Sequence, residues 1–211
     1  QRVQQAFEAQ QHFVADAAHE LRSPLAALTL QLQLLRKAPD DATRQAAQDD
    51  LAAGIERARR LVEQLLALAR QEAGAAAQAL STAALVDLRE LAEQVLADTA
   101  EAAQAKGLDM GLSEDPGQQA SFCVQADAQA LSMMLRNLLD NAIKYVPAGG
   151  RVDVGWLQDE HGRALVVEDS GPGIAAAERP RVLQRFVRGQ GAGSMAGGSG
   201  LGLAIVQAVA E

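Results

Sequence analysis

Apolar residues recur at helical spacing through the first third of the chain. From about Val3 to Lys37 they repeat every seven residues, with further apolar positions in between, as in the seam of a coiled coil. A second apolar stripe, at steps of three and four, runs over residues 51–69. The pattern therefore predicts two long helices. The first stripe consists of Val14, Ala18, Leu21, Leu25, Leu28, Leu32 and Leu35, and the second of Leu51, Ile55, Ala58, Val62, Leu65 and Ala69.

A polar segment, APDDATR at residues 38–44, separates the two predicted helices. Pro39 and the acids that follow it are typical of a place where one helix ends and another begins. Two long helices joined by a short loop form an antiparallel hairpin. Since one hairpin has only two helices with which to cover its apolar stripe, we expect a homodimer that forms a four-helix bundle.

The pattern changes after an Ala- and Gly-rich stretch at residues 73–80, which we interpret as a linker. Beyond it, helical and strand-like segments alternate, which predicts an α/β sandwich. The predicted fold class is thus α+β, with a hairpin domain at 1–72 and a mixed domain at 81–211. The helices of the mixed domain are predicted at about 87–106 and 127–145 and from residue 202 onward, and its strands at 108–112, 120–125, 151–157 and 163–169.

Composition narrows the classes of function. The chain has 211 residues, of which 48% are hydrophobic, enough for a sizeable core. Its net charge of -8, with no run of Lys and Arg, argues against nucleic-acid binding and favours a protein or small-molecule partner. Cys123 is the only cysteine, which excludes an internal disulfide, and we expect its thiol to be buried and reduced. The chain carries no signal-peptide pattern and no initiator Met, so we expect a fragment of a longer protein.

Two glycine-rich segments are candidates for ligand binding. In DSGPGI, Asp169 ends a strand before a tight turn at Gly171 and Gly173, where its carboxylate can accept a hydrogen bond from an exocyclic amine. An ordinary Gly-Pro turn is the alternative. In GGSGLGLAIVQ, residues 197–207, glycines precede an apolar helix whose free N–H groups favour phosphate. A dinucleotide-binding loop needs a strand directly before it and a Walker A loop needs a lysine after it, so neither fits this segment.

The segment LSMMLRNLLDNAIKY combines a polar and an apolar helix face. Asn137 and Asn141 are four residues apart, and Lys144 and Tyr145 follow one turn later on the same side. Amide oxygens can bind hydrated Mg²⁺ and a lysine can meet phosphate. A solvated helix face is the alternative. Arg188, which opens a Gly-rich span that we expect to form a loop, is either a phosphate contact or a surface charge.

The stretch FVADAAHELRSPL interrupts the first seam with polar residues. His19 lies beside the seam, where we expect it to be exposed, and Glu20 is its neighbour. Pro24 lacks a backbone N–H and its ring clashes with the carbonyl of Glu20, so we expect a kink within one turn of the histidine. An ordinary polar surface histidine is the alternative.

Taken in order, these segments resemble the catalytic core of a bacterial two-component sensor histidine kinase. FVADAAHELRSPL resembles the H box of the dimerisation and phosphotransfer domain, known as HisKA. NLLDNAIKY resembles the N box, VEDSGPGI the first glycine box, RFVR the F box and GGSGLGLAIV the second glycine box of the ATP-binding domain, which has the Bergerat (GHKL) fold. The order of the motifs makes the resemblance specific, and their style is similar to OmpR-partnered, QseC-like kinases.

The resemblance implies ATP-dependent autophosphorylation on His19, with Glu20 as general base, followed by phosphotransfer to an aspartate of a response regulator. It implies that Asn141 holds Mg²⁺ and that Asn137 assists. The remaining nucleotide contacts that it implies are Lys144 on the phosphates, Tyr145 near the adenine, Asp169 on the adenine amino group, Arg188 near the γ-phosphate, and Gly171, Gly173, Gly198, Gly200, Leu201 and Gly202 around the pocket and its lid.

Three further expectations come from the same resemblance. Ser23 stands four residues after the histidine, where many members use Thr or Asn to dephosphorylate the response regulator, and a serine hydroxyl can still orient water. The chain is expected to be the cytoplasmic portion of an inner-membrane protein, attached only through a sensor region that it does not contain. Family ATP-binding domains continue with further strands that this chain lacks, so we expect this one to be truncated at its C-terminus. If the protein ended here, a sheet edge would be exposed.

Two other functions compete with this interpretation. GHKL-type ATPases such as Hsp90, gyrase and MutL use a glutamate to activate water where this chain has Asn137, which disfavours direct hydrolysis. A non-catalytic dimerisation module with a degenerate nucleotide site is disfavoured because His19, Asn141, Asp169 and both glycine boxes are present.

Overall fold

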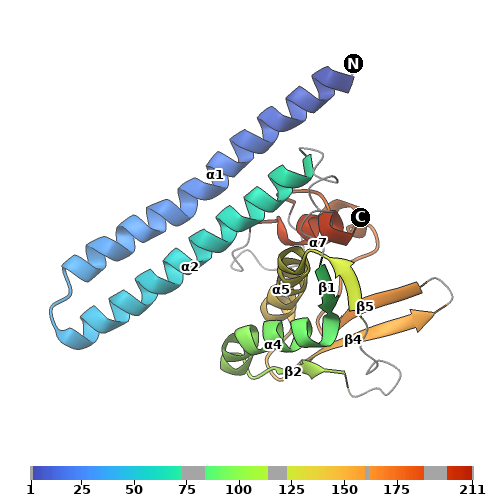
Figure 1. The fold of residues 1–211 in the computed structure, drawn as a ribbon. Coiled ribbons are helices and arrows are strands. Elements are labelled where there is room, and N and C mark those ends of the chain that lie inside the picture. The colour runs from blue at the N-terminus through green and yellow to red at the C-terminus, as the bar shows by residue number, and fades with distance from the viewer. Residues whose placement is uncertain (1, 73–83, 114–122, 160–161, 188–198, 211) are drawn as a thin grey trace. The chain divides into compact units, whose positions relative to one another are not determined.

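The computed structural model describes residues 2–72, 84–113, 123–159, 162–187 and 199–210. The chain divides into two compact units, Gln1–Ala69 and Arg70–Glu211 (Figure 1). The linker expected at 73–80 lies outside the described residues. The predicted domain boundaries at 72 and 81 therefore stay predictions.

The first unit is a hairpin of two long helices, as the seam predicts. Helix α1 spans Arg2–Arg36 and helix α2 begins at Asp41 and ends at Glu72. Asp40 precedes α2 and accepts a hydrogen bond from the backbone N–H of Thr43 at 2.7 Å, which satisfies one of the free donors of the first turn. Helix α1 runs through Pro24 without interruption, so the proline does not end it, and the expected kink stays a prediction.

The two helices of the hairpin approach closely at Gly54. A Cβ atom at this buried glycine would lie 2.5 Å from Gln31 Oε1 and 2.9 Å from Leu28 Cδ2, so a larger residue would require these two side chains of α1 to move. The contact covers only part of the apolar stripes. Seam positions that stay exposed in the single chain include Leu25 (59%), Leu32 (39%), Ile55 (54%) and Val62 (42%).

The second unit is a mixed α/β domain, as expected. Its elements are β1 (Ala84–Asp87), α4 (Leu88–Ala105), β2 (Asp109–Leu112), β3 (Cys123–Ala126), α5 (Ala128–Tyr145), β4 (Arg151–Asp159), β5 (Gly162–Asp169), α6 (Arg179–Val182) and α7 (Gly202–Ala210). Strands β1 and β3 pair antiparallel. Strand β4 is the centre of the other sheet, parallel to β2 and antiparallel to β5.

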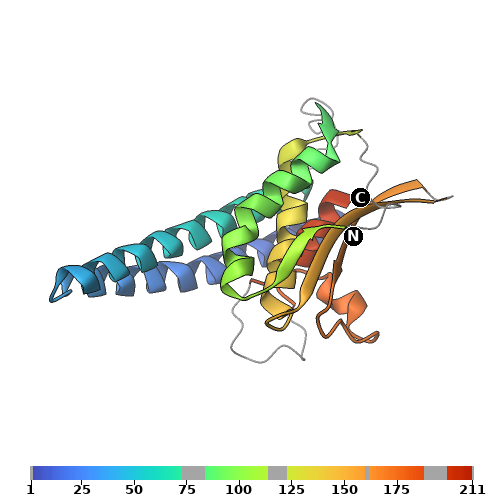
Figure 2. The same ribbon diagram turned by 90° about the horizontal axis from the view of Figure 1, so that it is seen from below.

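Helices α4 and α5 pack side by side and share one core with the sheets (Figure 2). Fully buried side chains of this core include Val95 of α4, Leu135 and Leu139 of α5, and Val152 and Val154 of β4. Helix α7 packs on α5 from another side. Helix α5 thus has its apolar face in the core and a second face toward α7.

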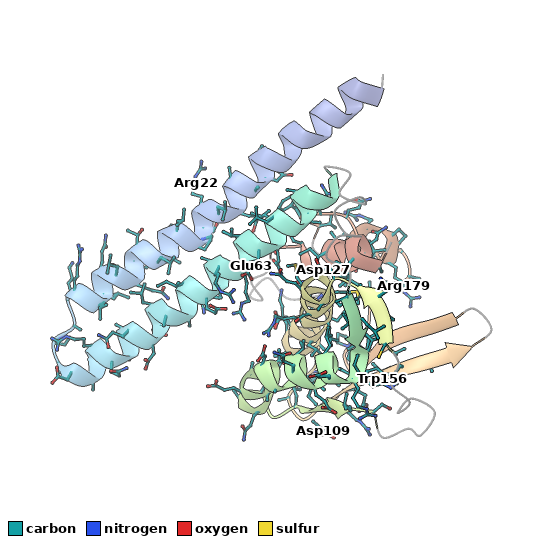
Figure 3. The ribbon with its side chains drawn as sticks, in the orientation of Figure 1. Arg22, Glu63, Asp109, Asp127, Trp156 and Arg179 are labelled. Atoms are coloured by element: carbon teal, nitrogen blue, oxygen red, sulfur yellow. The ribbon has the colours of Figure 1, made fainter. Side chains whose placement is uncertain are left out.

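Two aspartates determine where α4 and α5 begin. Asp87 accepts hydrogen bonds from the backbone N–H groups of Arg89 and Glu90, and Asp127 accepts them from Gln129 and Ala130. Both are N-cap residues with extended backbone, which is the geometry that this role requires. Figure 3 labels Asp127 at the start of α5.

The structure corrects the expectation for Cys123. The thiol was expected to be buried, but it is exposed. Cys123 begins β3, whose side chains alternate between exposed and half-buried, and the alternation places it on the solvent side opposite Asp87. No helix among the described residues has the length and the apolar character needed to cross a bilayer.

Candidate functional site

Helix α5 brings Asn137 and Asn141 against the start of α7. Asn137 is 6% exposed, and its amide Nδ2 donates a hydrogen bond to the Met133 carbonyl at 2.8 Å. A Cβ atom at Gly202 would lie 3.2 Å from Asn137 Oδ1 and 3.5 Å from Asn141 Nδ2. Because residue 202 has no side chain, the N-terminus of α7 can begin directly beside both amides.

The last turn of α5 carries a cation next to an aromatic ring. The ammonium of Lys144 lies 4.7 Å from the ring centroid of Tyr145. Lys144 is half-buried and Tyr145 is 40% exposed, so Tyr145 is still partly accessible to solvent. A cation over a tyrosine ring gains electrostatic stabilisation from the quadrupole of the ring.

Asp169 is held in place at the end of β5. Its Oδ1 accepts a hydrogen bond from the Gly171 N–H at 2.8 Å, which leaves Oδ2 as the oxygen for an outside donor. A Cβ atom at Gly171 would lie 2.6 Å from that Oδ1 and 3.4 Å from Val146 Cγ2. Val146 directly follows α5, so the turn after Asp169 packs on the end of that helix. Gly173 has φ +69°, a conformation that favours glycine.

These contacts arrange the predicted site residues along α5. Gly202 lies beside Asn137 near the middle of the helix, and Gly171 lies beside Val146 at its end. Asn137 and Val146 are nine positions apart, which corresponds to a rise of about 13 Å along a helix. A ligand that reaches from Asp169 to Gly202 would therefore be elongated. The carboxylate at one end can accept a hydrogen bond from an amine, and the helix N-terminus at the other end favours an anion.

The F box and the second glycine box are in backbone contact. The N–H of Phe186 donates to the Gly200 carbonyl at 2.9 Å. Phe186 has φ +60°, an uncommon value for a bulky residue, and Gly200 has φ +68°. A Cβ atom at Gly200 would lie 2.8 Å from the Phe186 carbonyl carbon. Leu201, which follows, is fully buried.

The H box lies on α1 and is described within the hairpin alone. His19 and Ser23 are exposed and Glu20 is half-buried. His19 and Ser23 are four residues apart, so they lie on the same face of the helix. Pro24 has no N–H to donate to the Glu20 carbonyl, which loosens the hydrogen-bond ladder beside the histidine.

Two predicted residues, Arg188 and Gly198, lie outside the described residues, so their roles stay predictions. Among the residues that the structure describes, no three His, Cys, Asp or Glu side chains gather as a metal site. The side-chain oxygens that could bind Mg²⁺ here are the amide oxygens of Asn141 and Asn137. Mg²⁺ takes oxygen ligands and commonly keeps waters and phosphate oxygens in its coordination sphere.

Sequence reasoning missed Val146 and Ser170 as parts of the site. Val146 supports Gly171, and Ser170 Oγ accepts a hydrogen bond from the Arg151 N–H at 2.8 Å. The signal for Val146 was its position directly after Tyr145. Ser170 had no signal, because its partner is 19 residues away in the chain.

Two protein families match the chain. The His Kinase A (phospho-acceptor) domain matches residues 9–74, and the histidine kinase-, DNA gyrase B- and HSP90-like ATPase family matches residues 126–211. His19 lies in the first match, and the residues from Asn137 to Gly202 lie in the second.

Similar proteins point to the same family. The sensor protein QseC of Salmonella typhi is 40% identical over 99% of this chain and 44% of its own length. The signal transduction histidine-protein kinase/phosphatase MprB of Mycolicibacterium smegmatis is 39% identical over 96% of this chain and 40% of its own length. The chain thus spans less than half of these curated relatives.

A solved structure supports the fold. The Acinetobacter baumannii histidine kinase AdeS superposes with a TM-score of 0.65 at 27% identity, over 90% of this chain and 85% of that one. The predicted order of a helical hairpin followed by a mixed α/β domain is confirmed. The chain belongs to the sensor histidine kinases, of which it carries the phospho-acceptor domain and the ATPase domain.

Proposed function

We propose that this chain is the core of a protein-histidine kinase, which phosphorylates its own His19 with ATP and passes the phosphoryl group to an aspartate of a response regulator. The observation that carries the proposal is the arrangement along α5. Two buried or half-buried amides meet a glycine at the start of α7, and the oriented carboxylate of Asp169 lies at the other end. An adenine nucleotide fits this arrangement, because it has an exocyclic amine at its adenine end and phosphates at its other end.

The first reaction is an attack on phosphorus by one ring nitrogen of neutral His19. A P–N bond forms at the γ-phosphorus while its bond to the bridging oxygen breaks, and ADP leaves with that oxygen. The proton on the other ring nitrogen is oriented or accepted by Glu20, which keeps the attacking nitrogen neutral. The exposure of His19 fits this role, because the nucleophile has to be reachable from outside the hairpin.

The nucleotide contacts divide into an adenine end and a phosphate end. Asp169 would accept a hydrogen bond from the adenine amino group, with Tyr145 beside the ring. The Lys144 ammonium, which lies over the Tyr145 ring, would move to contact phosphate oxygens. An anion attracts an ammonium more strongly than an aromatic face does. Bound Mg²⁺, held by Asn141 with Asn137 nearby, would neutralise charge on the phosphates.

The remaining roles follow the motifs. Gly171 and Gly173 would shape the turn at the adenine end, and Leu201 would anchor the start of α7 in the core. Arg188 would approach the γ-phosphate, and Gly198, Gly200 and Gly202 would form the lid and its hinge.

The proposal includes two protein partners. A second copy of the chain would cover the exposed seam residues of the hairpin, such as Leu25 and Ile55, in a four-helix bundle. A response regulator would dock on the hairpin near His19 to receive the phosphoryl group. The proposed location is the cytoplasmic side of a bacterial inner membrane, with attachment through a sensor region outside this chain.

A second activity, dephosphorylation of the response regulator, rests on Ser23. The relative MprB is named a kinase/phosphatase, and Ser23 is exposed one turn after His19. Its hydroxyl can orient a water toward a phosphoaspartate. With a receiver domain phosphorylated beforehand by acetyl phosphate, Ser23→Ala should slow release of phosphate and Ser23→Thr should restore it. Equal rates for all three proteins would remove this activity from the proposal.

The kinase proposal is tested by the chemistry of the labelled product. The chain is incubated with γ-labelled ATP and Mg²⁺, and protein-bound label and free phosphate are both measured. A kinase of this type yields protein-bound label that is lost in acid and kept in base, because a P–N bond hydrolyses in acid. A GHKL-type ATPase would release phosphate without labelling the protein. A non-catalytic dimerisation module would do neither, and each of these two results would contradict the proposal.

A further inference from the structure

Lys106 joins the end of helix α4 to the end of helix α5. It is the C-cap of α4, and its ammonium Nζ donates hydrogen bonds to the carbonyl of Ile143 at 2.5 Å and to the carbonyl of Lys144 at 2.8 Å. These partners are 37 and 38 residues away in the chain. The side chain is half-buried, so water competes only partly for these carbonyls.

The two carbonyls need such a donor because they lie in the last turn of α5. The last four carbonyls of an α-helix have no partner within the helix. The Val146 N–H donates to the Ala142 carbonyl at 2.9 Å, and the ammonium of Lys106 donates to the next two carbonyls, those of Ile143 and Lys144. A positive charge at this point also interacts favourably with the negative end of the helix dipole. Lys106 therefore caps α5 from a neighbouring helix.

The loops that follow the two helices are joined as well. The Gly149 N–H donates to the Gly107 carbonyl at 3.1 Å, and the Asp109 N–H donates to the Gly150 carbonyl at 2.9 Å. The turn after α4 and the turn after α5 thus form one hydrogen-bonded junction. Figure 2 shows the two helices side by side, and this junction lies where both of them end. A shift of the last turn of α5 would break these bonds together.

The capped turn carries groups of the proposed nucleotide site. It includes Lys144 and Tyr145, whose ammonium and ring are 4.7 Å apart. Val146 follows and lies under Gly171, whose N–H orients Asp169. Both hydrogen bonds from the Lys106 ammonium to α5 end on backbone carbonyls, so any effect on the nucleotide passes through the position of the turn.

We propose that Lys106 is a positioning residue for the nucleotide site: by capping α5 it holds Lys144, Tyr145 and Val146 in place for the nucleotide. This inference rests on the proposed function of the chain as an ATP-dependent kinase. Loss of the cap frays the turn, so nucleotide binding weakens. The chemical step on bound ATP changes little, because Asn137 and Asn141 lie further back in the helix.

The test uses the full 211-residue chain with three substitutions at one position. For Lys106→Met we expect about fivefold weaker binding of a fluorescent ATP analogue and a similar rise in KM for ATP, the size expected from losing a charged helix cap. The labelling rate at saturating ATP should stay within about twofold, since the proposed nucleophile His19 and the proposed Mg²⁺ ligands Asn137 and Asn141 lie outside the capped turn. Lys106→Arg should restore binding, because a guanidinium also donates to two carbonyls. The ATP affinity of Lys106→Gln, whose amide donates hydrogen bonds without a charge, should lie between those of Lys106→Met and Lys106→Arg.

Asp98→Asn is the matched control. It removes the ion pair between Asp98 of α4 and Arg136 of α5, so it loosens the same two helices without touching the end of α5. We expect its nucleotide affinity to match that of wild type. Melting temperatures of all variants show that each chain is folded.

Positioning is overturned if Lys106→Met binds ATP as well as wild type does, or loses no more affinity than Asp98→Asn. It is also overturned if Lys106→Arg fails to rescue binding while it is folded. A wild-type chain that binds no ATP would instead overturn the proposed function, and the positioning role with it.

Discussion

Phe186 and Gly200 are held together by a backbone hydrogen bond, from the Phe186 N–H to the Gly200 carbonyl at 2.9 Å. Both have a positive φ, and a Cβ atom at Gly200 would lie 2.8 Å from the Phe186 carbonyl carbon. The contact joins the F box to the second glycine box. A side chain at position 200 would therefore separate two parts of the proposed ATP site.

Gly200→Ala should weaken ATP binding by at least about tenfold, because it combines a strained φ with a backbone clash. Gly111→Ala is the control outside the site, since a Cβ atom at Gly111 of β2 would meet nothing within 4 Å. Gly200→Ala should also lose roughly 1 kcal/mol of stability from its positive φ. Equal ATP affinity in the two variants, measured by calorimetry, would show that the contact with Phe186 does not matter for binding.

Asn141→Ala should abolish labelling of the chain by γ-labelled ATP while the dimer stays intact. The reason is that the amide oxygen assigned to Mg²⁺ is lost, while the hairpin is untouched. Gln129→Ala removes an exposed carboxamide from the first turn of the same helix and should label normally. Labelling and light scattering on the same samples give both readouts. Mg²⁺-dependent labelling retained in Asn141→Ala would contradict the metal role.

Asp169→Asn should lower ATP affinity by about tenfold or more, the range expected for a lost hydrogen bond to a charged group. The carboxylate is oriented by the Gly171 N–H, so an amide in its place presents a donor toward the adenine amino group. Inosine triphosphate lacks that amino group, so wild type should bind it more weakly than ATP. In Asp169→Asn the difference between the two affinities should be smaller. The neighbouring Glu168→Gln changes an exposed carboxylate on the other side of the strand and should behave as wild type. An unchanged preference for ATP in Asp169→Asn would contradict the adenine assignment.

Asp40 should titrate at lower pH in the folded chain than in the unfolded one. The hydrogen bond from the Thr43 N–H lowers the pKa of this carboxyl below its usual value of 3.8. The folded state then binds fewer protons, so the cap stabilises α2 above about pH 4 and this contribution is lost as pH falls through the folded pKa. Carbon-detected NMR titration of the Asp40 carboxyl, with and without urea, measures both midpoints. A folded midpoint at or above the unfolded one would contradict the capping role.

Local patterns were enough to predict most of the elements. The predicted helices at about 87–106 and 127–145 agree closely with α4 and α5, because Asp87 and Asp127 mark their starts in the sequence itself. Strand β1 was not predicted, since its four residues run directly into α4 and its partner β3 lies about 40 residues further on. The exposure of Cys123 has the same origin, because the pairing with β1 decides which side chain of β3 faces solvent.

The site was predictable residue by residue, but its contacts were not. Asn137, Asn141, Asp169 and Gly202 stand in recognisable motifs, yet only the fold shows that Gly202 lies beside both amides. The capping of α5 by Lys106 depends on two helices ending at the same place, which no local pattern encodes. The roles of Asn137, Asn141, Asp169 and Gly202 in binding ATP and Mg²⁺ stay proposals.

The central claim is that His19 accepts the phosphoryl group, and one comparison tests it directly. Wild type and His19→Gln are incubated with γ-labelled ATP and Mg²⁺, and both are first shown to bind ATP equally. We predict acid-labile, base-stable label on wild type, with the phosphate mapped to His19, and none on His19→Gln. Equal labelling of the two proteins would contradict the account.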